Sequence, residues 1–140
     1  MREWKFPIEG QCRCGQVRMQ ITAPPFLTMA CHCRGCQRMT ASAYSLSVAV
    51  PTGGFAVTEG TPVIGGLHGP LQHYFCGYCM SWMFTRASLL EGADRFAPYI
   101  ETCTHEKLPW AATPAVHSYS DFPSPAEFPE LIDAYALGSP

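Results

Sequence analysis

The segment Cys31-His32-Cys33-Arg34-Gly35-Cys36 places three thiols within six residues and sets the plan of the whole chain. Two cysteine pairs flank it, Cys12-Arg13-Cys14 near the start and Cys76-Gly77-Tyr78-Cys79 past the middle. Of the eight cysteines, only Cys103 stands apart from these clusters. Seven clustered thiols divide into four, which close a tetrahedral zinc site, and three, which leave one coordination position open. The pattern therefore predicts one structural and one reactive zinc.

The composition favours a folded, β-rich chain. Hydrophobic residues make up 47% of the 140 positions, and charged residues only 14%, which argues against disorder. Thirteen prolines and twelve glycines interrupt the chain often, so short strands and loops are favoured over long helices. We expect residues 1–140 to form a single domain with a mostly β fold, a compact antiparallel sheet with short helical turns.

The periodicity of the apolar residues locates these elements. Val17, Met19 and Ile21 alternate with polar residues and predict a strand with one buried face. Further strands are expected at 26–33, 44–50, 55–58 and 63–64, with a helical turn at 35–40. Residues 127–137 are the best helix candidate because their apolar side chains recur at helical spacing.

The charge and the cysteine usage limit the possible partners. The formal charge is -2 and no block of Lys and Arg occurs, so we expect no nucleic-acid partner. No apolar run reaches the length of a membrane span, and residues 1–5 lack the apolar core of a signal peptide. We therefore expect a cytoplasmic protein, where clustered thiols indicate metal binding or catalysis. The tight spacings disfavour the alternative, a disulfide scaffold. The oligomeric state is not predicted.

The first and third clusters together supply four ligands for a structural zinc. In an extended Cys12-Arg13-Cys14 segment, alternate side chains share one face, so both sulfurs point the same way. Cys76 and Cys79 form a knuckle at the tip of a hairpin, where Gly77 suits the tight turn. A metal held by both pairs closes a long loop and pins the sheet.

The central cluster is the candidate reactive site. Cys31, Cys33 and Cys36 form a compact tripod, and the open fourth position of such a site is typical of catalytic zinc. Zinc there lowers the pKa of whatever binds it. The alternative is a second structural zinc whose fourth ligand comes from elsewhere in the chain, the candidates being His32, His68, His73 and Cys103.

Polar residues around the clusters are candidates for substrate binding. Arg13, Arg34 and Arg38 are suited to bind carboxylates of an anionic thiol through bidentate hydrogen bonds, and Gln37 is a further polar contact. The alternative is that these arginines balance the thiolate charge. The large aromatic residues are interpreted as core, namely Trp82, Phe84, Phe96 and Trp110.

Three motifs in this order resemble the glutathione-dependent formaldehyde-activating enzyme family, which includes centromere protein V relatives. The matching segments are 10–17, 31–38 and 75–79, which contain the clusters described above. The resemblance implies a mostly antiparallel β fold built around zinc. It also implies structural ligands at the first and third clusters, a reactive zinc on the central one, and an activity that joins formaldehyde to glutathione. Met80 departs from the family, which usually has glycine after the last cysteine.

The leading hypothesis is a zinc-dependent carbon–sulfur lyase that condenses glutathione or a related thiol with formaldehyde or another small aldehyde at the three-cysteine zinc. The alternative is a non-catalytic zinc module that binds a protein or another macromolecule. No side chain is identified as a general base.

Overall fold

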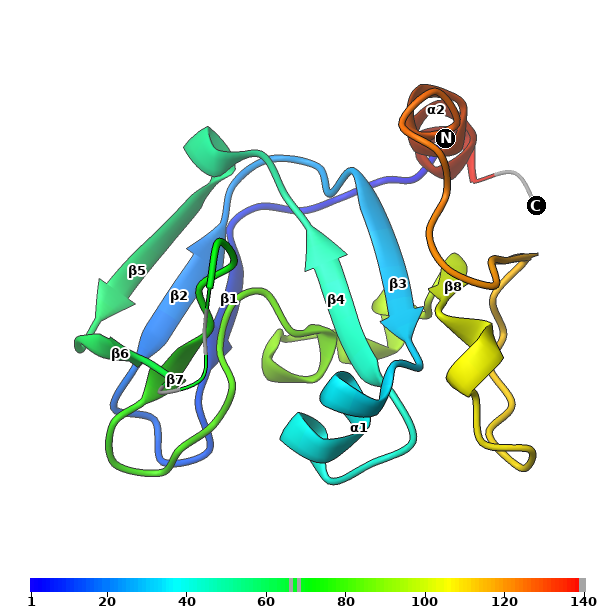
Figure 1. Ribbon diagram of the computed structural model, residues 1–140. Coiled ribbons are helices and arrows are strands. Elements are labelled where there is room, and N and C mark those ends of the chain that lie inside the picture. The colour runs from blue at the N-terminus through cyan, green and yellow to red at the C-terminus, as the bar shows by residue number, and fades with distance from the viewer. Residues whose placement is uncertain (66, 68, 139–140) are drawn as a thin grey trace.

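Short strands form two main sheets and a separate hairpin (Figure 1). The computed structural model describes residues 1–65, 67 and 69–138. The first sheet is antiparallel, in the order β1 (Ile8–Gln11), β2 (Arg18–Ile21) and β5 (Phe55–Glu59). The second has the order β4 (Ser45–Ala49), β3 (Leu27–Cys31), β8 (Ile100–Thr102) and β9 (His117–Ser118). The hairpin consists of β6 (Pro62–Ile64) and β7 (Tyr74–Cys76).

The mostly antiparallel prediction is confirmed, but β1 near the start and β8 and β9 in the last third lie outside the predicted strands. β3 pairs antiparallel with β4, as a sequence neighbour does. β8 runs parallel to both β3 and β9, because each long connection brings the chain back to the same end of the sheet before the next strand begins. These late strands have only three and two residues, too short for a periodicity to reveal.

The two α-helices lie where the sequence indicates them. α1 (Arg34–Thr40) begins at its N-cap Cys33 and ends at Ala41, which has a left-handed backbone. α2 (Phe128–Leu137) ends at Gly138 and packs Leu131 and Tyr135 onto Leu27 of β3. Shorter 3-10 turns are η1 (Thr52–Gly54), η2 (Ala87–Leu89), η3 (Ala93–Phe96) and η4 (Thr104–Glu106). Among the described residues, no helix is long and apolar enough to cross a membrane.

The buried face of the first sheet forms the larger core cluster. Met19 and Ile21 of β2 are fully buried, whereas Arg18, the first residue of β2, is exposed, as the alternation predicts. Phe96 is buried in the same cluster and Phe84 packs against it, which confirms their interpretation as core. Trp110 is 74% exposed, so its interpretation as core is wrong.

The fold brings the β1–β2 turn and the β7 knuckle together through β5 and β6. β5 pairs with β2, and the turn at Gly60 then leads into β6, which pairs Pro62 with Cys76. Gly60 has a φ of 76°, and a Cβ there would lie 2.2 Å from the carbonyl oxygen of Gln16. Only glycine allows the backbones to approach this closely. This contact seats the β5–β6 turn against the loop that carries the first cysteine pair.

Candidate metal centres

The first and third cysteine clusters meet in space. The Sγ atoms of Cys12, Cys14, Cys76 and Cys79 all lie within 4.8 Å of one another. The Cys12–Cys14 sulfur distance is 3.5 Å and the Cys14–Cys76 distance is 3.7 Å. Zinc–sulfur bonds of about 2.3 Å in a tetrahedron place the sulfurs about 3.8 Å apart, close to these values. The donor set and its spacing therefore fit a tetrahedral thiolate site.

The local backbone explains how the first pair converges, and it differs from the extended segment predicted above. Cys12 to Gly15 is a turn, because Gly15 N donates to Cys12 O at 3.1 Å and Gly15 has a φ of 80°. Val17 N donates to the Cys12 sulfur at 3.4 Å. The two sulfurs thus face one point because the chain reverses direction, and not because they share a strand face. The extended interpretation is wrong for this segment.

The knuckle forms as a hairpin tip, as predicted, but its unusual backbone lies at Met80. Phe75 bridges Trp82, and Met80 N donates to Cys76 O at 2.9 Å. Met80 has a φ of 61°, a left-handed conformation that favours glycine. Gly77 has no positive φ, so the reason given for it above is wrong. The departure from the family glycine leaves the turn intact.

Hydrogen bonds to sulfur support the knuckle further. Cys79 N donates to the Cys76 sulfur at 3.4 Å, and the Ser81 hydroxyl lies 3.2 Å from the Cys79 sulfur. Hydrogen bonding to Ser81 lowers the pKa of Cys79 to about 5. Ser81 Oγ also accepts from Arg13 N at 3.1 Å, which joins the knuckle to the β1–β2 turn. These donors stabilise thiolates independently of a bound metal.

The central cluster forms a second group with three sulfurs. Cys31 ends β3, Cys33 is the N-cap of α1, and Cys36 lies in the first turn of that helix. Their Sγ atoms lie within 4.8 Å of one another, and Cys36 N donates to the Cys33 sulfur at 3.2 Å. Hydrogen bonding with Cys36 lowers the pKa of Cys31 to about 4, while Cys31 raises the pKa of Cys36. The three sulfurs therefore share protons and fit one cation.

The proposed fourth ligands are absent from this group in the described part of the chain, which contributes only the three sulfurs. His32 is fully buried and faces Glu101 instead. Burial raises the pKa of Cys103 to about 12, as for a neutral buried thiol. His73 packs edge-on against Trp82. His68 lies outside the described residues. All eight cysteines are free thiols in the structure, and the described residues contain no disulfide.

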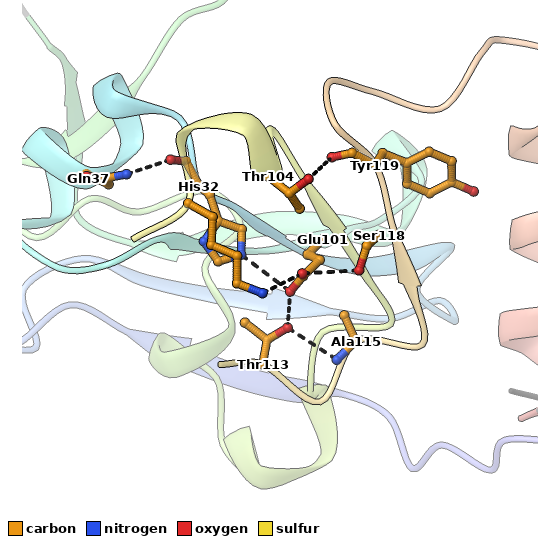
Figure 2. Close-up of polar contacts among 9 residues, drawn as sticks. His32, Gln37, Glu101, Thr104, Thr113, Ala115, Ser118 and Tyr119 are labelled. Atoms are coloured by element: carbon orange, nitrogen blue, oxygen red, sulfur yellow. Dashed lines mark hydrogen bonds and ion pairs between the residues drawn. The ribbon is translucent and has the colours of Figure 1, made fainter. Parts of the chain in front are cut away.

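A buried polar network holds the loop between Cys31 and Cys33 (Figure 2). His32 Nε2 lies 3.4 Å from Glu101 Oε2, and the His32 amide donates to Thr102 O at 3.0 Å. Lys107 Nζ and Ser118 Oγ donate to Glu101 Oε1 at 2.7 and 3.1 Å, and Thr113 donates to Oε2. The network fixes the strand end from β8, far away in sequence. Sequence reasoning missed it, since no motif joins these residues.

The residues predicted to bind substrate have different environments. Gln37 is buried, and its Nε2 donates to His32 O at 2.7 Å and to Glu106 O at 3.0 Å, so it holds the tripod loop. Arg34 is exposed and its Nη1 donates to Gln37 Oε1 at 2.7 Å. Arg38 is exposed on α1, and Arg13 is exposed near the other group. The structure thus brings Arg34 and Gln37 together beside the tripod.

The comparisons with known proteins agree with this geometry. The model of the glutathione-dependent formaldehyde-activating enzyme family matches residues 7–121, which include all seven clustered cysteines. A Halomonas elongata protein named for this family is 30% identical over 87 residues. That match spans 55% of each chain, about half the length of this curated relative.

A solved Rhodobacter sphaeroides structure aligns with a TM-score of 0.47 at 20% identity, over 60% of this chain and 88% of that one. At this level the likeness carries no weight beside the family match. The two cysteine groups lie within the matched residues 7–121, and their order is that of the motifs quoted from the sequence. The chain belongs to the glutathione-dependent formaldehyde-activating enzyme family.

Proposed function

We propose that this protein is a zinc-dependent carbon–sulfur lyase that joins glutathione or a related small thiol to formaldehyde or another small aldehyde. The observation that carries the proposal is the unequal division of the sulfurs. Cys12, Cys14, Cys76 and Cys79 offer four ligands, whereas the central group offers three and, among the described residues, no fourth. A three-ligand site leaves a position for a substrate.

Each group has a separate task in this proposal. The first holds a structural zinc, and its sulfurs join the β1–β2 turn to the knuckle. Cys31, Cys33 and Cys36 would hold a second zinc, which would supply the Lewis acidity that lowers the pKa of a thiol in the open position. Glu101, Lys107 and Gln37 keep the tripod in place through the contacts described above. Arg34 and Arg38 remain predicted contacts for substrate carboxylates.

The reaction is an addition that needs no co-reactant. The thiol sulfur forms a bond to the carbonyl carbon while the carbon–oxygen π bond breaks. The thiol proton ends on the new hydroxyl, so thiol and aldehyde give a hydroxymethyl thioether with all atoms retained. The reverse direction regenerates both substrates. The cytoplasmic location predicted above suits a reaction that needs a reduced thiol.

Cobalt substitution of the central site tests the proposal. A thiol that enters the open position adds a sulfur–cobalt charge-transfer band, so millimolar glutathione is expected to change the spectrum of the cobalt protein. Cys33→Ser is expected to abolish that change and reduce the metal content. An unchanged wild-type spectrum, together with no formation of S-hydroxymethylglutathione, would favour the non-catalytic module.

A further inference from the structure

A cavity of about 720 Å³ is lined by residues that neighbour both cysteine groups. Its wall includes Ser81 of the knuckle and Thr40 of α1. Ser81 contacts the Cys79 sulfur at 3.2 Å, and the Thr40 hydroxyl donates to Cys36 O at 2.7 Å. The cavity therefore borders residues that contact each group. Its volume is within the range of small-molecule sites.

One cation, Arg86, lines this cavity and contacts the face of β4 that lies beside Cys31. Cys31 is the direct partner of Ser45 across β3 and β4, and Ser47 follows on the same face of β4. Arg86 Nη1 donates to Ser47 Oγ at 2.6 Å. Two residues along a strand span about 7 Å, so the serine that holds the guanidinium lies about 7 Å along β4 from the residue paired with Cys31.

Arg86 has hydrogen-bonding capacity to spare. Its guanidinium stacks on the Trp82 ring, 3.2 Å from the centroid, and its buried Nε has no hydrogen-bond partner. Within 1–65, 67 and 69–138, no carboxylate forms an ion pair with it, whereas Arg18 pairs with Glu59. Burial lowers the pKa of Arg86 to about 10 while the charges of Cys36 and Cys31 oppose this, so Arg86 is a cation at neutral pH and within electrostatic range of the tripod. A partly desolvated guanidinium without a carboxylate partner binds anions strongly.

We propose that this cavity binds a carboxylate of the thiol substrate through Arg86, so that the site selects small thiols that carry an acid group. The inference deepens the proposed function and rests on it for the thiol end of the ligand. A planar carboxylate matches the fork of the guanidinium, and the sulfur end then extends along β4 toward Cys31 and Cys36. Arg86 is a binding residue here, and neither Arg34 nor Arg38 lines this cavity.

Calorimetric binding of S-methylglutathione tests the proposal, because this probe keeps both carboxylates but has no free thiol. The wild-type protein is expected to bind it 10- to 100-fold more tightly than the diethyl ester, which lacks the charges. Arg86→Gln is expected to weaken binding of the acid by the same factor and leave the ester unchanged. Arg18→Gln, which removes an exposed arginine elsewhere, is the matched control and is expected to match the wild type.

The other results overturn the inference. These results are equal affinity of the wild type for acid and ester, no binding of either probe, or an acid-to-ester affinity ratio in Arg86→Gln that equals that of the wild type. If circular dichroism shows that Arg86→Gln does not fold, Ser47→Ala is the test variant. It removes the hydroxyl that accepts a hydrogen bond from Arg86 and is expected to reduce the acid-to-ester affinity ratio severalfold. The probe needs no thiol chemistry. The cobalt experiment can therefore fail, and refute the lyase, while the Arg86 site stands.

Discussion

Replacing Cys76 by serine tests whether the four-sulfur group joins distant parts of the chain. Cys14 and Cys76 are 62 positions apart in sequence, yet their sulfurs lie 3.7 Å from each other. Treated as a cross-link over a loop of that length, the bound metal removes about 4 kcal/mol of chain entropy from the unfolded state. Single domains are stable by only about 5–15 kcal/mol. Loss of the buried Cys76 ligand is therefore expected to lower the free energy of unfolding by about 2–4 kcal/mol.

Cys33→Ser is expected to behave differently because the tripod is local. Its three cysteines lie within one strand end and one helical turn, so a metal there restricts little of the unfolded chain. Cys33 is also the N-cap of α1 and its side chain accepts from Cys36 N, a role that serine fills well. The expected loss of stability is below about 1 kcal/mol, together with loss of the central metal.

Urea unfolding followed by circular dichroism, in reducing buffer with excess zinc, measures these differences. Cys103→Ser is the matched control, because Cys103 is buried like Cys76 but belongs to neither sulfur group. It measures the cost of replacing a buried thiol that interacts with Cys31 but is not one of the four sulfurs of the first group. The cross-link argument would be refuted if Cys76→Ser and Cys103→Ser lost equal free energies of unfolding, or if Cys33→Ser lost as much as Cys76→Ser.

Three further predictions concern the residues that position the groups. Gly60→Ala is expected to lower the free energy of unfolding by at least about 2 kcal/mol, because it strains the backbone and clashes with the neighbouring turn. Gly53→Ala, which has open space around it, is the control and is expected to leave stability unchanged. Thermal unfolding of the two variants makes the comparison. Gln37→Leu leaves two carbonyls without their donor and is expected to weaken metal binding at the tripod about 10- to 100-fold, measured by competition with a chromophoric chelator. Burial raises the pKa of Glu101, but donation from Lys107 and two hydroxyls outweighs it and lowers the pKa to about 2. Its stabilising effect is therefore complete above about pH 4.5 and lost toward pH 2, so the stability difference between wild type and Glu101→Gln, about 3 kcal/mol at pH 6, is expected to vanish across that range. A constant difference down to pH 2 would contradict this.

Much of the candidate site follows from local sequence, because cysteine ligands lie close together along the chain. Cys31, Cys33 and Cys36 converge through one helical turn, and Cys76 and Cys79 through one knuckle. The strands β2 to β7 follow from alternation and from the prolines and glycines between them. The predicted backbone of Cys12 to Cys14 was wrong because two sulfurs converge equally well from a strand face or from a turn.

Spacing of the cysteines thus predicts two groups of four and three sulfurs that could hold metal ions, while the apolar pattern and the prolines and glycines predict the short β elements that carry them. The parallel addition of β8, the buried Glu101 beside His32, and Arg86 over the face of β4 depend on the whole fold. Each of these joins residues 39 or more positions apart, and no local pattern records such a contact. Their positions result from tertiary packing: Glu101 is buried where Lys107, Thr113 and Ser118 donate to it, whereas Arg86 is held by Ser47 and the Trp82 ring without a carboxylate partner among the described residues.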